Sequence, residues 1–234
     1  MRVCAMMSDA FLSGRASAGG SQMKSVVILI SGRGSNLQAL LDAKLPGRVA
    51  AVISDRAEAL GLALAQARGV ATAVLDHRRY ASREAFDAAL ADEIAAHGAD
   101  LVVLAGFMRI LGDDFVRRFS GRLLNIHPSL LPLFPGLKPH AQALAAGVKI
   151  HGCTVHFVTP ALDAGPIVIQ AAVPVHGDDD ENELAARVLV QEHRIYPLAV
   201  RWFLEDRLCL TPEGRVALAD EGPPASPLIA PVAA

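Results

Sequence analysis

Asn125 and His127 are the residues whose types and spacing most clearly suggest chemistry, and they stand two positions apart in an apolar run that ends at Pro128. Residues two apart in a β-strand point to the same face of a sheet. The proline keeps His127 extended and prevents a helix from starting there. The sequence therefore predicts an amide and an imidazole side by side at the carboxyl end of a strand, where open α/β sheets bind ligands.

This pair of side chains suits attack on a small carbonyl group. Asn125 can donate an N–H to an oxyanion, and neutral His127 can take the proton that an incoming amine loses. The alternative is that both side chains only satisfy backbone groups of a loop, because isolated motif matches are often coincidental.

A glycine-containing loop, Ser31–Asn36, follows the first apolar run and precedes a helical pattern. Its two glycines let backbone N–H groups close around an anion at the positive end of the helix, and its serine and asparagine side chains add donors. The loop therefore predicts a phosphate site. A dinucleotide site is the rival interpretation, because Asp55 stands where a ribose-binding acid would, although Leu37 replaces the third glycine of that fingerprint. A plain strand-to-helix turn is the other alternative.

Two carboxylates stand at informative positions. Asp163 lies in a turn-rich segment shortly before Gly165, and next to His127 it would raise the imidazole pKa and hold its tautomer. By itself it is equally an ordinary turn aspartate. Glu192 falls on the apolar i+4 stripe of the last long helix, so it either meets a buried partner or extends to solvent at the edge of that stripe.

From Val26 onward, short β-branched runs alternate with Ala-rich helical stretches. This pattern predicts an α/β fold: a single-domain, mainly parallel twisted sheet with helices on both faces, Rossmann-like. We expect strands at 25–30, 49–54, 71–75, 100–104, 122–127, 150–158 and 166–174. We expect helices at about 36–43, 57–68, 82–97, 112–119 and 180–205, the last opened by a capping box at Asp180 and Glu183.

Composition narrows the possible functions. The 234 residues are 52% apolar, which suffices for the core of one large α/β domain. A formal net charge of −2 gives no field that would gather nucleic acid or an anionic membrane, and the run 25–30 is too short to span a bilayer. His, Cys and carboxylates form no ligand cluster, so we expect no metal, and cysteine usage fits a cytoplasmic protein.

The ends of the chain differ in composition from its centre. Residues 1–24 are rich in Ala, Ser, Met and Gly, and we expect a disordered N-terminal lead there. The compact domain is expected over 25–210. Residues 211–234 are expected to form a frayed tail, because Pro and Ala dominate that segment.

Four motifs, in this order and spacing, resemble the phosphoribosylglycinamide formyltransferase family over about residues 25–210. They are SGRGSNLQA at 31–39, LAGFMRIL at 104–111, NIHPSLLP at 125–132, and FVT at 157–159 followed by Leu162 and Asp163. The resemblance implies a formyltransferase fold and a cytoplasmic enzyme of purine (IMP) biosynthesis. Such an enzyme transfers a formyl group directly from 10-formyltetrahydrofolate to the glycyl amine of glycinamide ribonucleotide, without a metal, as a monomer or homodimer.

The resemblance also implies roles for individual residues. Asn125 and protonated His127 would stabilise a tetrahedral oxyanion, and Asp163 would tune His127. The substrate phosphate and ribose would be bound by Gly32, Arg33, Gly34, Ser35, Asn36 and Glu192. The folate would be bound by Arg83, Met108, Arg109, Ile110, Leu111, Asn125, Val158, Thr159 and Asp163.

Other formyl-handling enzymes share the Asn-His-Asp trio. Formyltetrahydrofolate deformylases carry an additional N-terminal domain, and methionyl-tRNA formyltransferases carry a C-terminal RNA-binding domain. We expect neither addition in this sequence. A catalytically silent nucleotide-binding module stays open as an alternative of another class, because motif spacing does not prove activity.

Overall fold

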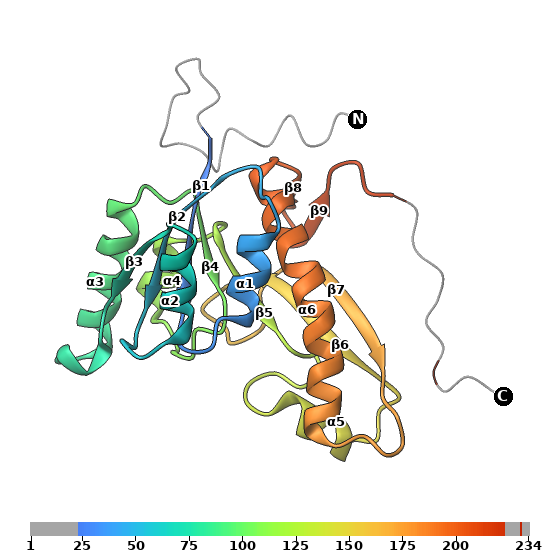
Figure 1. The fold of residues 1–234 in the computed structure, drawn as a ribbon. Coiled ribbons are helices and arrows are strands. Elements are labelled where there is room, and N and C mark those ends of the chain that lie inside the picture. The colour runs from blue at the N-terminus through green and yellow to red at the C-terminus, as the bar shows by residue number, and fades with distance from the viewer. Residues whose placement is uncertain (1–22, 223–229, 231–234) are drawn as a thin grey trace.

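The computed structural model describes residues 23–222 and residue 230, and its centre is a seven-stranded sheet of order β3-β2-β1-β4-β5-β6-β7 (Figure 1). The strands from β3 to β5 in this order are parallel, and β6 pairs antiparallel with both β5 and β7, which confirms the predicted mainly parallel α/β fold. The strands are β1 (Ser25–Ile30), β2 (Arg48–Ser54), β3 (Ala71–Val74), β4 (Leu101–Leu104), β5 (Leu123–His127), β6 (Ile150–Phe157) and β7 (Ile167–Pro174).

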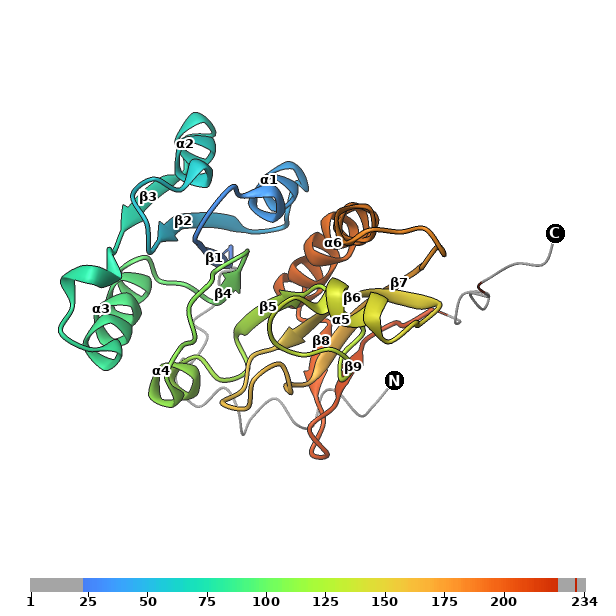
Figure 2. The same cartoon turned by 90° about the horizontal axis from the view of Figure 1, so that it is seen from below.

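Helices cover both faces of the sheet, because its central strands are apolar on both sides. In β1, Val26 and Ile28 belong to one buried cluster, whereas Val27 and Leu29 belong to another. Figure 2 shows α1, α2 and α6 on one side of the sheet and α3 and α4 on the other. Their bounds are α1 (Ser35–Asp42), α2 (Leu60–Ala67), α3 (Arg83–Ala96), α4 (Asp113–Arg118) and α6 (Glu181–Leu204).

The capping box predicted for the last long helix is present at the start of α6. The Asp180 carboxylate accepts from the Glu183 backbone N–H at 2.8 Å, and the Glu183 carboxylate accepts from the Asp180 N–H at 3.0 Å. Two of the orphan N–H groups at this helix end are thereby satisfied, which fixes where α6 begins. No helix in the described part of the chain is long and apolar enough to cross a membrane.

Four short elements were not predicted from the sequence. They are the 3₁₀ turn η1 (His77–Arg79), helix α5 (Pro139–Ala145), and the hairpin of β8 (Leu208–Leu210) and β9 (Val216–Leu218). The start of α5 agrees with the preference for proline in the first helical turn. The helix expected from residue 57 instead begins at Leu60, because the preceding residues form a turn.

The hairpin corrects the expected frayed tail, which is wrong for residues 216–218. Leu208 and Val216 pack against the main core, and the Arg207 guanidinium donates to the Ala219 carbonyl at 3.0 Å. These contacts order a segment whose composition alone gives no strand signal. At the other end, the Arg48 N–H donates to the Lys24 carbonyl at 2.9 Å, so order begins before residue 25. The rest of the expected lead, residues 1–22, lies outside the described residues.

Candidate active site

Asn125 and His127 lie at the carboxyl end of β5, as predicted. Ile126 between them packs into the core beneath α6, so the two polar side chains point to the opposite face. The imidazole is almost fully buried, whereas Asn125 is partly exposed. The strand thus presents an amide and an imidazole together at the carboxyl edge of the sheet.

His156 orients the Asn125 amide. Antiparallel pairing of β6 with β5 places the two residues opposite each other, with Asn125 Nδ2 3.2 Å from His156 Nε2. His156 Nδ1 lies 3.0 Å from the Phe157 carbonyl, which only accepts, so Nδ1 carries the proton and Nε2 accepts from the amide. Burial lowers the pKa of His156, which favours this neutral form.

His156 was missed as a site residue by sequence reasoning. Its spacing from His151 only excluded a simple two-histidine metal site. The informative signal is the register between β5 and β6, which is known only once the two strands are paired. Among the residues that the structure describes, no group of three or more His, Cys, Asp or Glu side chains is arranged to hold a metal ion.

Asp163 reaches the same place from the loop after β6, as the motif predicted. Its Oδ2 lies 3.6 Å from His127 Nδ1, and its Oδ1 lies 3.9 Å from His156 Nε2. The Gly136 N–H donates to Oδ2 at 2.9 Å, and His127 Nε2 donates to the Phe134 carbonyl at 3.0 Å. The carboxylate and the loop over the site therefore hold the His127 ring from two sides.

The glycine loop leads into α1, whose N-terminus has no side-chain cap. Its first N–H groups therefore remain available to a ligand. Gly32, Arg33 and Ser35 are exposed, and a Cβ built on Gly32 would meet nothing within 4 Å. Gly34 has a different role: its φ is +82°, and a Cβ there would lie 2.9 Å from the Gly61 Cα of α2. Gly34 is needed for packing of α1 against α2.

Asn36 and Glu192 join the glycine loop to α6. The Asn36 amide donates to Glu192 Oε2 at 2.7 Å, and both residues are buried. Burial raises the pKa of the Glu192 carboxyl, while the hydrogen bond from Asn36 and the charge of His127 act against that rise. Glu192 is thus buried and paired with Asn36, and the alternative that it extends to solvent is wrong.

The segment 108–111, after β4, alternates between exposed and packed side chains. Met108 and Ile110 are exposed by 69% and 68%, whereas Leu111 packs against the α3–α4 core, as Val158 does from the neighbouring loop. The Met108 N–H donates to the Ser31 hydroxyl at 2.9 Å. This contact couples the segment to the glycine loop.

Arg109 belongs to this segment, and Arg83 lies near the residue that follows it, Gly112. The Arg109 guanidinium lies 5.2 Å from the centre of the Phe86 ring, and Arg83 Nε lies 3.7 Å from the Glu84 carboxylate. Thr159, on the facing loop, donates its hydroxyl to the Ala161 carbonyl at 3.3 Å. The residues predicted for the folate therefore lie on the two loops at this end of the sheet, on the adjacent end of α3 and, for Asn125, at the end of β5.

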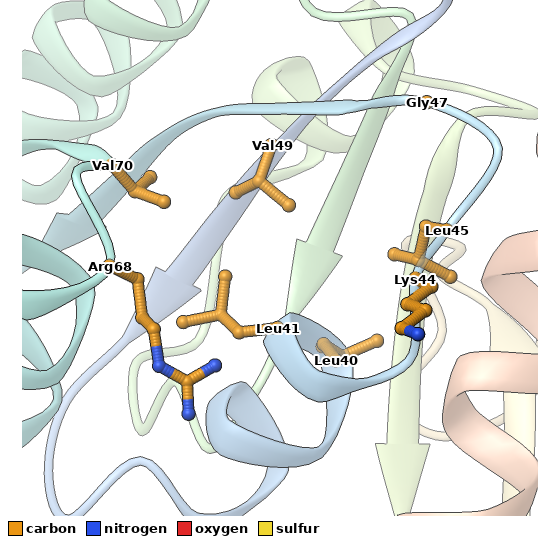
Figure 3. Close-up of a pocket in the computed structure, with 8 residues that line it drawn as sticks. All are labelled: Leu40, Leu41, Lys44, Leu45, Gly47, Val49, Arg68 and Val70. Atoms are coloured by element: carbon orange, nitrogen blue, oxygen red, sulfur yellow. The ribbon is translucent and has the colours of Figure 1, made fainter.

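Two other features lie apart from this site. Asp55, which the dinucleotide alternative needs at a ribose, is 2% exposed and sits 3.6 Å from His77 Nδ1, so it does not face a ligand. A cavity of about 330 Å³ opens between the end of α1 and the starts of β2 and β3 (Figure 3). It contains none of the predicted site residues, being lined by Leu40, Leu41, Lys44, Leu45, Gly47, Val49, Arg68 and Val70.

Comparison with known proteins identifies the family of this chain. Residues 23–200 match the model of the family described as formyl transferase. Phosphoribosylglycinamide formyltransferase of Escherichia coli (strain K12) is 54% identical over 187 residues, which cover 78% of this chain and 88% of that protein.

Solved structures agree with the sequence match. Glycinamide ribonucleotide transformylase 1 from Symbiobacterium toebii superposes with a TM-score of 0.83 at 52% identity, covering 89% of this chain and 100% of that one. A formyltetrahydrofolate deformylase from Pseudomonas syringae pv. tomato superposes with a TM-score of 0.79 at 31% identity, covering 86% of this chain and 67% of that one. The chain therefore belongs to the formyl transferase family, and within it to the phosphoribosylglycinamide formyltransferases.

Proposed function

We propose that this protein transfers a formyl group from 10-formyltetrahydrofolate to the glycyl amine of glycinamide ribonucleotide, a step of purine (IMP) biosynthesis. The products are the N-formyl ribonucleotide and tetrahydrofolate. The observation that carries the proposal is the convergence of Asn125, His127 and Asp163 at the end of β5, within a family of formyl transferases.

The chemistry follows from the groups that meet there. The amine nitrogen attacks the formyl carbon, a C–N bond forms, and the formyl oxygen becomes an oxyanion. Asn125 Nδ2 has a second N–H beyond the one held by His156, and this N–H together with protonated His127 stabilises the oxyanion. Collapse breaks the bond between the formyl carbon and N10 of the folate.

Proton transfer accompanies these bond changes. The attacking amine loses a proton, and N10 of the departing folate gains one, so the net reaction consumes no proton. Asp163 lies near the His127 imidazole and favours its charged form while the oxyanion exists. No enzyme side chain forms a bond to the formyl group in this direct transfer.

The ribonucleotide binds along the glycine loop. Backbone N–H groups of Gly32 to Asn36, at the uncapped start of α1, receive the 5′-phosphate. Glu192 accepts hydrogen bonds from the ribose hydroxyls, with Asn36 holding its carboxylate in place.

The folate binds on the other side of the catalytic residues. The two loops 108–111 and 158–163 receive the pterin through their backbone groups, and Arg83 and Arg109 lie where the folate carboxylates emerge. The exposed side chains of Met108 and Ile110 provide apolar contact. We further propose that the enzyme works in the cytoplasm, without a metal, as a monomer or homodimer.

Substitution of the two β5 residues tests the proposal. Asn125→Ala and His127→Ala should each lower kcat by about 100-fold or more, the size of a lost oxyanion donor or acid–base group. His97→Ala provides a matched control, because His97 pairs with Glu93 on α3, away from the site. Near-normal turnover of a folded Asn125→Ala or His127→Ala protein would remove that residue from the mechanism.

A further inference from the structure

Asp87 is a buried carboxylate beneath the segment assigned to the folate. It lies on α3 and is 6% exposed. Its Oδ2 accepts the backbone N–H of Gly112 at 2.7 Å. Gly112 directly follows the segment 108–111 and is the N-cap of α4, so one carboxylate oxygen holds the end of that segment.

The second oxygen of Asp87 has no hydrogen-bond partner among the described residues, although it is buried. Burial raises the pKa of Asp87, while the Gly112 hydrogen bond and the charges of Arg83 and Arg109 act in the opposite direction. Arg83 stands about one helical turn before Asp87 on α3, and Arg109 belongs to the segment that directly precedes Gly112. A carboxylate buried this way is costly, so packing alone gives no reason for its presence.

The contact with Asp87 requires that residue 112 has no side chain. A Cβ built on Gly112 would lie 2.9 Å from Asp87 Oδ2, closer than a carbon and an oxygen normally approach. Any larger residue would push the carboxylate away. The contact between Asp87 and Gly112 thus depends on both residues, which allows it to be broken from either side.

We propose that Asp87 is a positioning residue for the folate. Its hydrogen bond to Gly112 fixes the backbone of residues 108–112, and it is this bond, not the negative charge, that positions the segment. This inference rests on the proposed function, because it takes the folate as the ligand of this segment. Asp87 touches neither substrate, so it acts only through the loop that it holds.

The test combines four variants with a matched control. Asp87→Ala removes the acceptor, Gly112→Ala displaces it, a double variant does both, and Asp87→Asn keeps an acceptor oxygen without the charge. Asp92→Ala is the control, since that exposed carboxylate on the same helix pairs with Arg118 at 3.0 Å and does not contact the segment. Calorimetry with folic acid measures Kd, and steady-state kinetics measure KM for each substrate.

Asp87→Ala and Gly112→Ala should each raise the Kd for folic acid and the KM for 10-formyltetrahydrofolate by about tenfold, as expected for one lost hydrogen bond to a charged acceptor. The KM for glycinamide ribonucleotide should not change. The double variant should resemble each single variant, because all three break one contact. Asp87→Asn should recover most of the affinity, and Asp92→Ala should match wild type.

Several results would overturn the inference. One is an unchanged Kd for folic acid in a folded Asp87→Ala or Gly112→Ala protein, and another is an equal rise of the KM values for both substrates. Additive losses of folic acid affinity in the double variant, or no recovery of that affinity in Asp87→Asn, would overturn it as well. If the Asp87→Ala protein does not fold, the Kd of the Gly112→Ala protein for folic acid still tests the inference. Wild type that binds folic acid but forms no formylated ribonucleotide would refute the proposed function, while the Kd comparison would still test Asp87.

Discussion

Replacing His156 by phenylalanine separates the orientation of Asn125 from its direct chemical role. The substitution removes the acceptor Nε2, which lies 3.2 Å from Asn125 Nδ2, and keeps a ring of similar shape. His156 is 2% exposed and its pKa is lowered by burial, so an apolar ring in that place should leave the fold intact.

The size of the effect follows from the bond that is lost. A neutral hydrogen bond is worth about 0.5–1.5 kcal/mol, so kcat should fall about twofold to twelvefold if the whole bond is needed to aim the amide. Loss of the oxyanion donor itself, in Asn125→Ala, should cost about 100-fold to 1000-fold. The two variants should therefore differ clearly in rate.

A double-mutant cycle provides the assay. We expect Asn125→Ala combined with His156→Phe to turn over as slowly as Asn125→Ala alone, because His156 acts through an amide that is then absent. His97→Phe provides the matched control, as its ring pairs with Glu93 on the protein surface. Fully additive losses, or a loss of 100-fold from His156→Phe alone, would refute the positioning role.

Three further predictions concern the loop, the lead and acid stability. Gly32→Val should raise the KM for glycinamide ribonucleotide at least about tenfold and leave the folate KM unchanged, because its side chain would occupy the open space at the phosphate loop. Equal wild-type use of the unphosphorylated riboside would contradict this assignment, whereas Gly34→Val is expected to lower stability as well, through Gly61. Deletion of residues 1–22 should leave kcat and Tm almost unchanged, and a large drop in Tm would show that this segment packs on the domain. Burial lowers the pKa of His151 from 6.5 to about 4, so the folded state favours the neutral ring. The resulting stability is complete above pH 6.5 and is lost as the pH falls toward 4, by up to about 3 kcal/mol. The difference in urea unfolding free energy between wild type and His151→Phe should therefore be constant above pH 6.5 and shift against wild type in acid, and parallel pH curves would contradict the reasoning.

The sequence patterns predicted the sheet and the long helices well, because β-branched runs and helical periodicity dominate those segments. The β8–β9 hairpin was missed because its strands have three residues each and depend on contacts with the core. Helix α5 was missed for a similar reason, since seven residues give little periodicity.

In the site, too, local sequence patterns predicted some residues, and contacts between distant segments were missed. Strand alternation alone predicts that Asn125 and His127 lie side by side. The sequence of the glycine loop alone predicts a phosphate site. Contacts from distant segments were not predicted: His156 reaches Asn125 through sheet register, and Asp87 reaches Gly112 through the packing of α3 against the loop before α4. Glycine is needed at position 34 because a Cβ there would lie too close to Gly61 of α2. This requirement depends on how α1 and α2 pack, which no local pattern encodes.

Transfer of labelled formyl by the wild-type protein tests the central claim most directly. The enzyme is mixed with 10-formyltetrahydrofolate carrying ¹³C in the formyl group, with and without glycinamide ribonucleotide, and the products are followed by NMR and mass spectrometry. We predict that the label appears in the N-formyl ribonucleotide, in equal amount to the tetrahydrofolate formed and only when the amine is present. Release of the label as formate, with or without the amine, would contradict the account.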